Sequence, residues 1–104
     1  MIASSVLSKC RPRFQAGCLV MTPAVEKLVN GGTFELRDYL CRHLACDWGE
    51  ISASDRRANE VALTGGGPLF SSYHISPDVN LGFVTDAARL RTTAFLPHET
   101  LTSH

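Results

Sequence analysis

LFSSYHISPDVNLGFVT, residues 69–85, is the stretch of sequence that decides the fold. Apolar side chains alternate with small or polar ones along 69–75 and again along 79–85, which is the period of a β-strand that buries one face. Ser76-Pro77-Asp78 lies between the two runs and is typical of a turn. A third alternating run covers 90–96 and ends at Pro97, which cannot continue a ladder. Three short strands with short connections predict an antiparallel meander.

Before the meander, the apolar residues follow the period of a helix. Thr22-Pro23 predicts the start of a short helix that ends at Asn30-Gly31-Gly32. Thr33 is expected to cap a second helix and Ser52 a third, which ends at the glycine run 65–67. Helices that precede a set of strands are typical of α+β domains. We therefore predict an α+β fold, in which two to three N-terminal helices pack on a three-stranded antiparallel β-meander.

The first twenty residues differ from the rest in charge. Residues 1–20 hold three basic residues and no acidic one, whereas residues 21–104 hold seven basic and ten acidic residues. The leading segment has no periodic apolar pattern, and its residues 2–7 are too few and too polar for a secretory signal. We expect residues 1–20 to be a flexible leader or a non-native upstream extension, with Met21 as the natural start. Residues 21–104 would then form a single α+β domain.

Length and charge narrow the possible functions. A chain of 104 residues fits one domain, and its ten basic residues balance its ten acidic ones. A neutral chain is not typical of a dedicated nucleic-acid binder, so direct binding to nucleic acid is not expected. The longest apolar run, residues 17–21, is far too short to span a membrane. We expect a cytoplasmic protein that does not act at a membrane.

Patterns that resemble reactive sites are better explained as structural features. Cys41-x-His43-x-x-Cys46 does not match the paired spacing of zinc ligands, and the absence of an export signal argues against disulfides among the four cysteines. The glycine run 65–67 follows a predicted helix and lacks the lysine of a phosphate loop. Acidic residues flank Trp48, but sequence proximity alone does not make an acid–base pair. We predict no catalytic residue, no metal site and no cofactor.

One face of the predicted sheet is a candidate binding surface. Phe70, Ser72, His74, Arg91 and Phe95 are expected on this half-open face. Aromatic and basic side chains on an uncovered face fit a docking surface for another protein. The alternative is an ordinary solvated face, with the aromatic side chains tucked under the helices.

The chain also resembles a known family. The segments that carry the resemblance are Thr22-Pro23, Asp47-Trp48-Gly49-Glu50, Asp55-Arg56-x-x-Asn59-x-x-Ala62-Leu63, Ser71-x-Tyr73 and Thr92-Thr93-x-x-Leu96-Pro97. Their pattern is similar to that of small uncharacterised proteins from plasmids and other mobile elements, some of which carry a restriction–modification label. Gly82 departs from the pattern where an aromatic residue is expected, and Ala88 departs where an acid is expected. The resemblance implies an accessory protein that binds host machinery, and it implies no catalytic residues.

We therefore hypothesise a small non-enzymatic protein-interaction module from a mobile element, which inhibits a host defence complex of the anti-restriction or anti-CRISPR type. Its partner would be a host protein or nucleoprotein complex. The candidate binding residues are Trp48, Glu50, Arg56, Tyr73, His74, Arg89, Arg91 and Phe95. One alternative is a small enzyme or toxin that acts on RNA or a nucleotide through His74, Arg89 and Arg91. Another is a homodimeric accessory protein that pairs an exposed edge strand.

Overall fold

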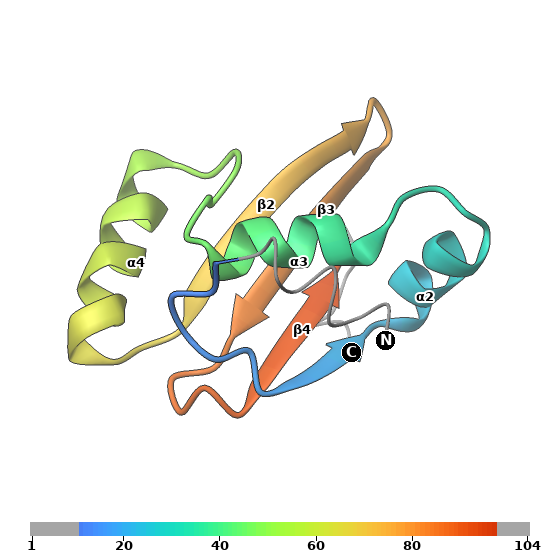
Figure 1. The fold of residues 1–104 in the computed structure, drawn as a ribbon. Coiled ribbons are helices and arrows are strands. Elements are labelled where there is room, and N and C mark those ends of the chain that lie inside the picture. Colours follow the sequence, from blue (N-terminus) through green and yellow to red (C-terminus); the bar gives the residue numbers. More distant parts are fainter. Residues whose placement is uncertain (1–10, 98–104) are drawn as a thin grey trace, which may run out of the picture.

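The computed structural model describes residues 11–97, which form three helices and one four-stranded sheet. The helices are α2 (Pro23–Asn30), α3 (Leu36–Leu44) and α4 (Ala53–Gly65). The strands are β1 (Cys18–Met21), β2 (Leu69–Ser76), β3 (Val79–Thr85) and β4 (Arg91–Phe95). In Figure 1, α3 crosses one face of the sheet, while α4 lies beside β2 and α2 follows the end of β1. The predicted α+β class is confirmed.

The sheet is mixed, with the strand order β1-β4-β3-β2. β2, β3 and β4 pair antiparallel, so the predicted meander is confirmed. β1 adds a fourth strand parallel to β4, with Cys18 opposite Arg91 and Met21 opposite Ala94. The prediction of a three-stranded sheet was therefore incomplete. A four-residue strand that pairs in parallel with the far end of the chain leaves no local alternation or hairpin turn to find.

Two of the three predicted helix starts are confirmed. The Thr22 side chain accepts from the backbone N–H of Val25 at 3.4 Å, and that of Ser52 accepts from Asp55 at 3.0 Å. Thr33 does not cap α3, whose N-cap is Glu35. Its N–H instead donates to the Leu28 carbonyl at 3.0 Å, which closes the end of α2. Among the described helices, none is long and apolar enough to cross a bilayer.

The part of the leader that the structure describes, residues 11–20, packs against the domain. The predicted boundary before Met21 falls inside β1. Upstream of that strand, the N–H of Arg13 donates to the Leu44 carbonyl at 2.8 Å, and the Phe14 ring stacks on Trp48 with centroids 6.2 Å apart. These contacts order a segment whose own sequence is too irregular to order itself. Residues 1–10 lie outside the described part of the chain.

The helices cover one face of the sheet and form two adjoining clusters with it. The larger cluster joins α2, α3 and the strands, and its centre is made of Val25, Leu36, Tyr73, Leu81, Phe83, Ala94 and Leu96. The smaller cluster joins the connector before α4 to the start of β2 through Trp48, Ala62 and Leu69, with Phe14 packed beside them. The apolar residues of the alternating runs therefore lie on the face that the helices cover.

The outer edge of β2 is covered over its first half. The Asn59 side chain, projecting from α4, makes two hydrogen bonds with the Phe70 backbone, at 2.7 Å to its carbonyl and 3.0 Å from its N–H. Residues 48–50 then run parallel to β2, and the Ser72 N–H donates to the Trp48 carbonyl at 3.1 Å. The Glu50 N–H donates to the Ser72 carbonyl at 2.7 Å. These bonds satisfy backbone groups that an edge strand otherwise leaves open.

Candidate functional site

The face of the sheet opposite the helices is the candidate site, and we call it the open face. Its residues alternate with the buried positions of β2, β3 and β4, and Val20 of β1 joins them through its pairing with Thr93. They are Val20, Phe70, Ser72, His74, Val84, Arg91, Thr93 and Phe95. The pairing register aligns Val20, Thr93, Val84 and Phe70 in one row across all four strands. No described helix packs on this row, so its side chains are only partly covered. The open face therefore carries a partly exposed apolar strip.

Phe95 shapes the middle of the open face. Phe95 lies opposite Gly82 in the register, and a Cβ at position 82 would approach the Phe95 ring to 2.9 Å. The ring therefore lies over the glycine and buries it, in the way that an aromatic side chain shields a strand glycine. The Phe70 ring is next, with its centroid 6.2 Å from that of Phe95. The space that an aromatic side chain at position 82 would need is filled from the neighbouring strand.

The polar candidates of the open face lie at its two ends. His74 is exposed near the β2–β3 turn, where its Nδ1 is 3.0 Å from the Asn80 Oδ1. Arg91 is exposed at the start of β4, level with Asp86, the residue that follows β3. Because six residues of extended strand separate Asn80 from Asp86, His74 and Arg91 are about 20 Å apart. The structure does not bring these two together as one reactive site.

Arg89 belongs to the loop between β3 and β4 and binds the end of α4. Its backbone is left-handed, with φ 61°. Its guanidinium donates to the carbonyls of Gly67 at 2.6 Å, Asp86 at 2.9 Å and Ala62 at 3.0 Å. Ala62 lies in the last turn of α4, where the helix dipole favours a cation, and its carbonyl also accepts from the Gly66 N–H at 3.0 Å. Arg89 is therefore a helix-capping residue, and its guanidinium is already engaged by the fold.

Trp48 and Tyr73 lie in the core and not on a binding surface. They are 2% and 1% exposed, so a partner cannot contact either side chain unless the fold opens. The Tyr73 hydroxyl donates to the Asp47 carbonyl at 2.6 Å, and burial raises the pKa of Tyr73 above its ordinary value. No acceptor for the buried Nε1 of Trp48 is found among residues 11–97. Their choice as candidates rested on residue type, which does not report burial.

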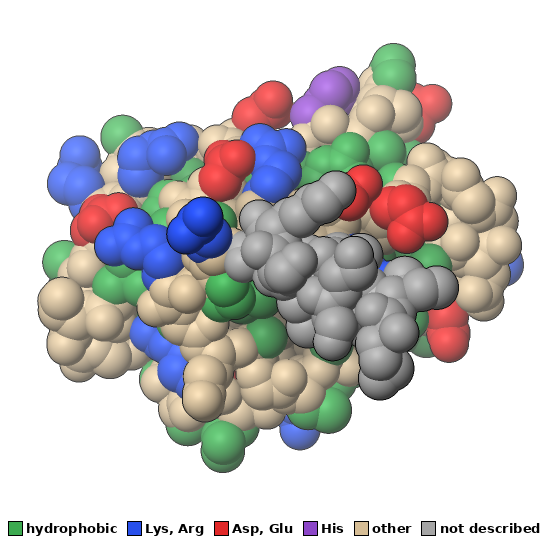
Figure 2. Space-filling model, viewed as in Figure 1, with side chains coloured by type: hydrophobic (Ala, Val, Ile, Leu, Met, Phe, Trp, Pro, Cys, Tyr) green, Lys and Arg blue, Asp and Glu red, His purple; other side chains and the backbone are tan. Residues whose placement is uncertain are grey.

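Glu50 and Arg56 lie beside the covered edge of β2 and not in the rows of the open face. Both are exposed near the start of α4, and Arg56 donates to the Gly49 carbonyl at 3.3 Å. Beside them Arg42 pairs with Asp47 at 2.8 Å, and this hydrogen bond lowers the pKa of the Asp47 carboxyl. Figure 2 shows basic side chains gathered at this end of the helix-covered face, with acidic side chains between them. The mixture of signs makes this surface a weak attractor for a polyanion.

His43 lies in a hydrogen-bond network that the sequence does not predict, and its pKa is strongly shifted. It is fully buried on α3, with Nδ1 2.6 Å from the Ser71 hydroxyl and Nε2 2.9 Å from the Thr85 hydroxyl. The Thr85 hydroxyl is in turn 2.7 Å from that of Thr92, which donates to the Ala16 carbonyl at 2.7 Å. This chain of side chains links α3, three strands and the N-terminal segment.

One acceptor sets the direction of every bond in that chain. A carbonyl can only accept, so Thr92 gives its proton to Ala16 and must receive one from Thr85. The Thr85 hydroxyl can then only accept from His43, so the Nε2 of His43 carries the proton. The Nδ1 of neutral His43 accepts from Ser71. Burial, with a smaller contribution from the Arg89 charge, lowers the pKa of His43 to about 3. The imidazole is thus neutral, enclosed and structural.

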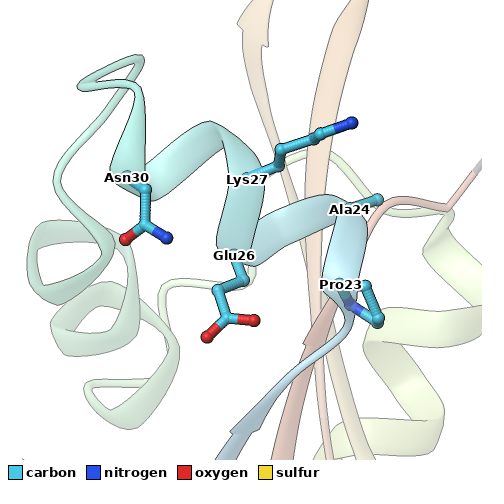
Figure 3. Close-up of a pocket in the computed structure, with 5 residues that line it drawn as sticks. All are labelled: Pro23, Ala24, Glu26, Lys27 and Asn30. Atoms are coloured by element: carbon cyan, nitrogen blue, oxygen red, sulfur yellow. The ribbon is translucent and has the colours of Figure 1, made fainter.

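A surface cavity lies on α2 and not on the open face. It has a volume of about 360 Å³ and is lined by Pro23, Ala24, Glu26, Lys27 and Asn30. Figure 3 shows these side chains fanning out from a single short helix instead of converging on one point. Among residues 11–97, no group of three or more His, Cys, Asp or Glu side chains is placed to hold a metal ion.

The chain matches no protein-family model, no curated protein and no solved structure. The resemblance to proteins of mobile elements therefore stays a prediction from the residues. The functional assignment depends on the open face, where Phe70, His74, Arg91 and Phe95 lie as the alternation of the strands predicts.

Proposed function

We propose that this protein is a non-enzymatic binding module whose open face docks on a protein partner. The observation that carries the proposal is that this face stays uncovered by any described helix while it presents Val20, Phe70, Val84 and Phe95 in adjacent rows. Partly exposed aromatic and branched side chains in one strip are the kind of surface that gains free energy on binding a protein.

Charge gives the partner a further property. Among the outward positions of the four strands, Arg91 carries the only formal charge. A partner that fits this face has an apolar centre and a carboxylate placed to meet Arg91 at its rim. Such a rim pair adds specificity and association rate more than affinity. Single-stranded or duplex nucleic acid fits less well, because its phosphates need several cations on one surface.

The class of partner that we propose is a bacterial defence complex of the restriction or CRISPR type. The support for this class is the resemblance of the Asp47-Trp48-Gly49-Glu50 and Asn59-x-x-Ala62-Leu63 segments to proteins of mobile elements. Inhibition by occupation of a surface needs no catalytic group. This agrees with the described side chains, in which His74 lies about 20 Å from Arg91 and the Arg89 guanidinium is bound by carbonyls of the fold.

A plating assay tests this function directly. The full chain is produced in bacteria that carry one defined restriction or CRISPR system, and the efficiency of plating of unprotected phage is measured. We expect wild type to raise plating at least tenfold against the system that it inhibits. Arg91→Glu and Phe70→Asp should abolish the rise, because both place a carboxylate on the open face. Val61→Asp is the matched control, since Val61 is 67% exposed on α4.

Binding is then measured with the purified defence complex and each variant. Co-elution of wild type and Val61→Asp, but not of Arg91→Glu or Phe70→Asp, supports the proposal. Thermal melting of each variant checks that loss of binding is not loss of folding. The proposal is overturned if no system is inhibited, or if the open-face variants inhibit as well as wild type does.

A further inference from the structure

One edge of the sheet is covered by other parts of the described chain, and the other edge is not. The β2 edge is closed over Phe70 and Ser72 by Asn59 and by residues 48–50. The β1 edge has no such cover among the described residues, and Leu19 and Val20 on it are 39% and 38% exposed. An uncovered edge strand is a template for another strand.

The hydrogen bonds of β1 show which of its backbone groups are open. The N–H of Cys18 donates to Leu90 at 2.9 Å and that of Thr22 to Ala94 at 3.1 Å. In a parallel ladder, alternate residues of a strand face the neighbouring strand. The even-numbered residues of β1 therefore face β4, whereas the N–H and C=O groups of Leu19 and Met21 point away from it.

We propose that β1 pairs antiparallel with β1 of a second copy of this chain, about a two-fold axis at Val20. In this register Leu19 is opposite Met21 of the second copy, and the two residues exchange both of their hydrogen bonds. The symmetry repeats this pair, which gives four hydrogen bonds. Val20 then faces its own counterpart as a non-hydrogen-bonded pair, in which the two side chains lie closest together.

A second copy fits this edge because β1 matches itself. The strand Cys18–Met21 carries no charge, so antiparallel pairing brings no like charges together. It also holds neither the lysine nor the proline with which edge strands commonly prevent pairing. Pairing would cover Leu19 and Val20, which are two of the four large exposed apolar side chains among the described residues. An isologous contact of this kind closes at two chains and does not propagate.

The dimer would join the two sheets into one sheet of eight strands. Directly opposed residues of an antiparallel pair project to the same side, so the two open faces would lie side by side. This inference does not depend on the proposed partner, since self-association is measured on the protein alone.

The mass of the full chain in solution, measured by light scattering over a concentration series, is the first test. We expect twice the chain mass of 11.3 kDa at the upper concentrations. Leu19→Pro should return the mass to that of the monomer, because it removes an N–H that points away from β4. Its melting temperature should stay close to that of wild type.

Symmetric cross-linking tests the register. In a Cys10→Ser, Cys18→Ser background, Val20→Cys should form a disulfide-linked dimer on mild oxidation, because non-hydrogen-bonded partners have Cα atoms about 4.5 Å apart. Leu19→Cys is the matched control. Its counterpart in the second copy is a diagonal neighbour at roughly 8 Å, which exceeds the span of a disulfide.

A dimer mass that Leu19→Pro abolishes, with cross-linking of Val20→Cys and not of Leu19→Cys, supports the proposal. A monomer mass at every concentration would overturn it. So would a dimer that Leu19→Pro leaves intact, or equal cross-linking of the two cysteine variants. Loss of defence inhibition without loss of the dimer would instead count only against the proposed function.

Discussion

At the scale of single residues, Arg89 shows how a side chain that looks functional can be structural. Its guanidinium reaches the carbonyls of Ala62 and Gly67 across the gap between the β3–β4 loop and the end of α4. Nothing in the local sequence predicts this reach, because the two segments are brought together only by the sheet. Ala62 is also a buried member of the smaller core cluster, so the cap lies beside packed side chains.

We expect Arg89→Ala to lower the free energy of unfolding by about 3 kcal/mol, since charge-assisted hydrogen bonds contribute about 1.5–3 kcal/mol each and do not add fully. Urea unfolding followed by circular dichroism measures this loss. Arg57→Ala on exposed α4 is the control and should change stability by less than about 0.5 kcal/mol. Equal stability of Arg89→Ala and wild type would show that the cap contributes nothing.

At the scale of elements, Asn59 joins α4 to the β2 edge. Its amide both accepts from the Phe70 N–H and donates to the Phe70 carbonyl, so it takes the place of a missing strand residue. Asn59 is 2% exposed, and these bonds are therefore shielded from water. Removing the amide leaves a buried donor and a buried acceptor without partners, which costs more than the bonds themselves contribute.

Asn59→Ala should therefore lower the free energy of unfolding by about 2–4 kcal/mol. Asn59→Asp should cost a comparable amount, because a carboxylate cannot donate to the Phe70 carbonyl. Hydrogen exchange at the Phe70 amide gives the local readout and should speed up in both variants. Ser54→Ala, on an exposed position of the same helix, is the control. An unchanged exchange rate at Phe70 in Asn59→Ala would contradict this role.

The elements also show what the sequence can and cannot predict. The alternation over 69–95 is local and period-two, so it predicts β2, β3 and β4 and the phase of the open face. It also puts Tyr73 in phase with Leu69 and Ser71, a signal of burial that selection by residue type overlooked. β1 depends on a partner at the other end of the chain, and pairing of that kind has no local signature.

At the scale of the whole molecule, residues 11–21 contribute to the sheet, to the packing around Trp48 and to the hydrogen-bond network of His43. They supply the edge strand β1 and the Phe14 ring, which packs against Trp48 and His43. They also supply the Ala16 carbonyl, which is the last acceptor in the hydrogen-bond network of His43. The predicted start at Met21 would remove most of these groups. A chain that begins at Met21 should therefore lose about 3–5 kcal/mol of unfolding free energy, the range for deleting one large core ring.

Denaturant unfolding of the shortened chain and of the full chain measures this difference. Phe14→Ala in the full chain should account for a large part of it, whereas Gln15→Ala at the adjacent exposed position should have little effect. If the shortened chain unfolds at the same denaturant concentration as the full chain, residues 11–20 add no stability and the contacts of Phe14 are incidental.

The buried hydrogen-bond network of His43 makes the stability of the whole molecule depend on pH. Folding holds the pKa of His43 at about 3, against an ordinary value of 6.5, because its neutral ring is enclosed by hydroxyls and aromatic rings. Below pH 6.5 the His43 imidazole binds a proton in the unfolded chain but not in the folded chain. The stabilisation is therefore complete above that pH and is lost as the pH falls toward 3.

We expect the free energy of unfolding to fall by up to about 1.4 kcal/mol per pH unit over this range, or about 5 kcal/mol in all, from this one group. Carboxylates add their own acid-dependent loss, so the informative quantity is the difference between wild type and His43→Gln, measured by denaturant unfolding at a series of pH values. His43→Gln should be less stable at pH 7, because its network is broken, yet it should lose less stability on acidification. Parallel curves of unfolding free energy against pH for wild type and His43→Gln would mean that His43 titrates in the folded protein as it does in the unfolded chain. The claim that the folded protein keeps this ring neutral would then be wrong.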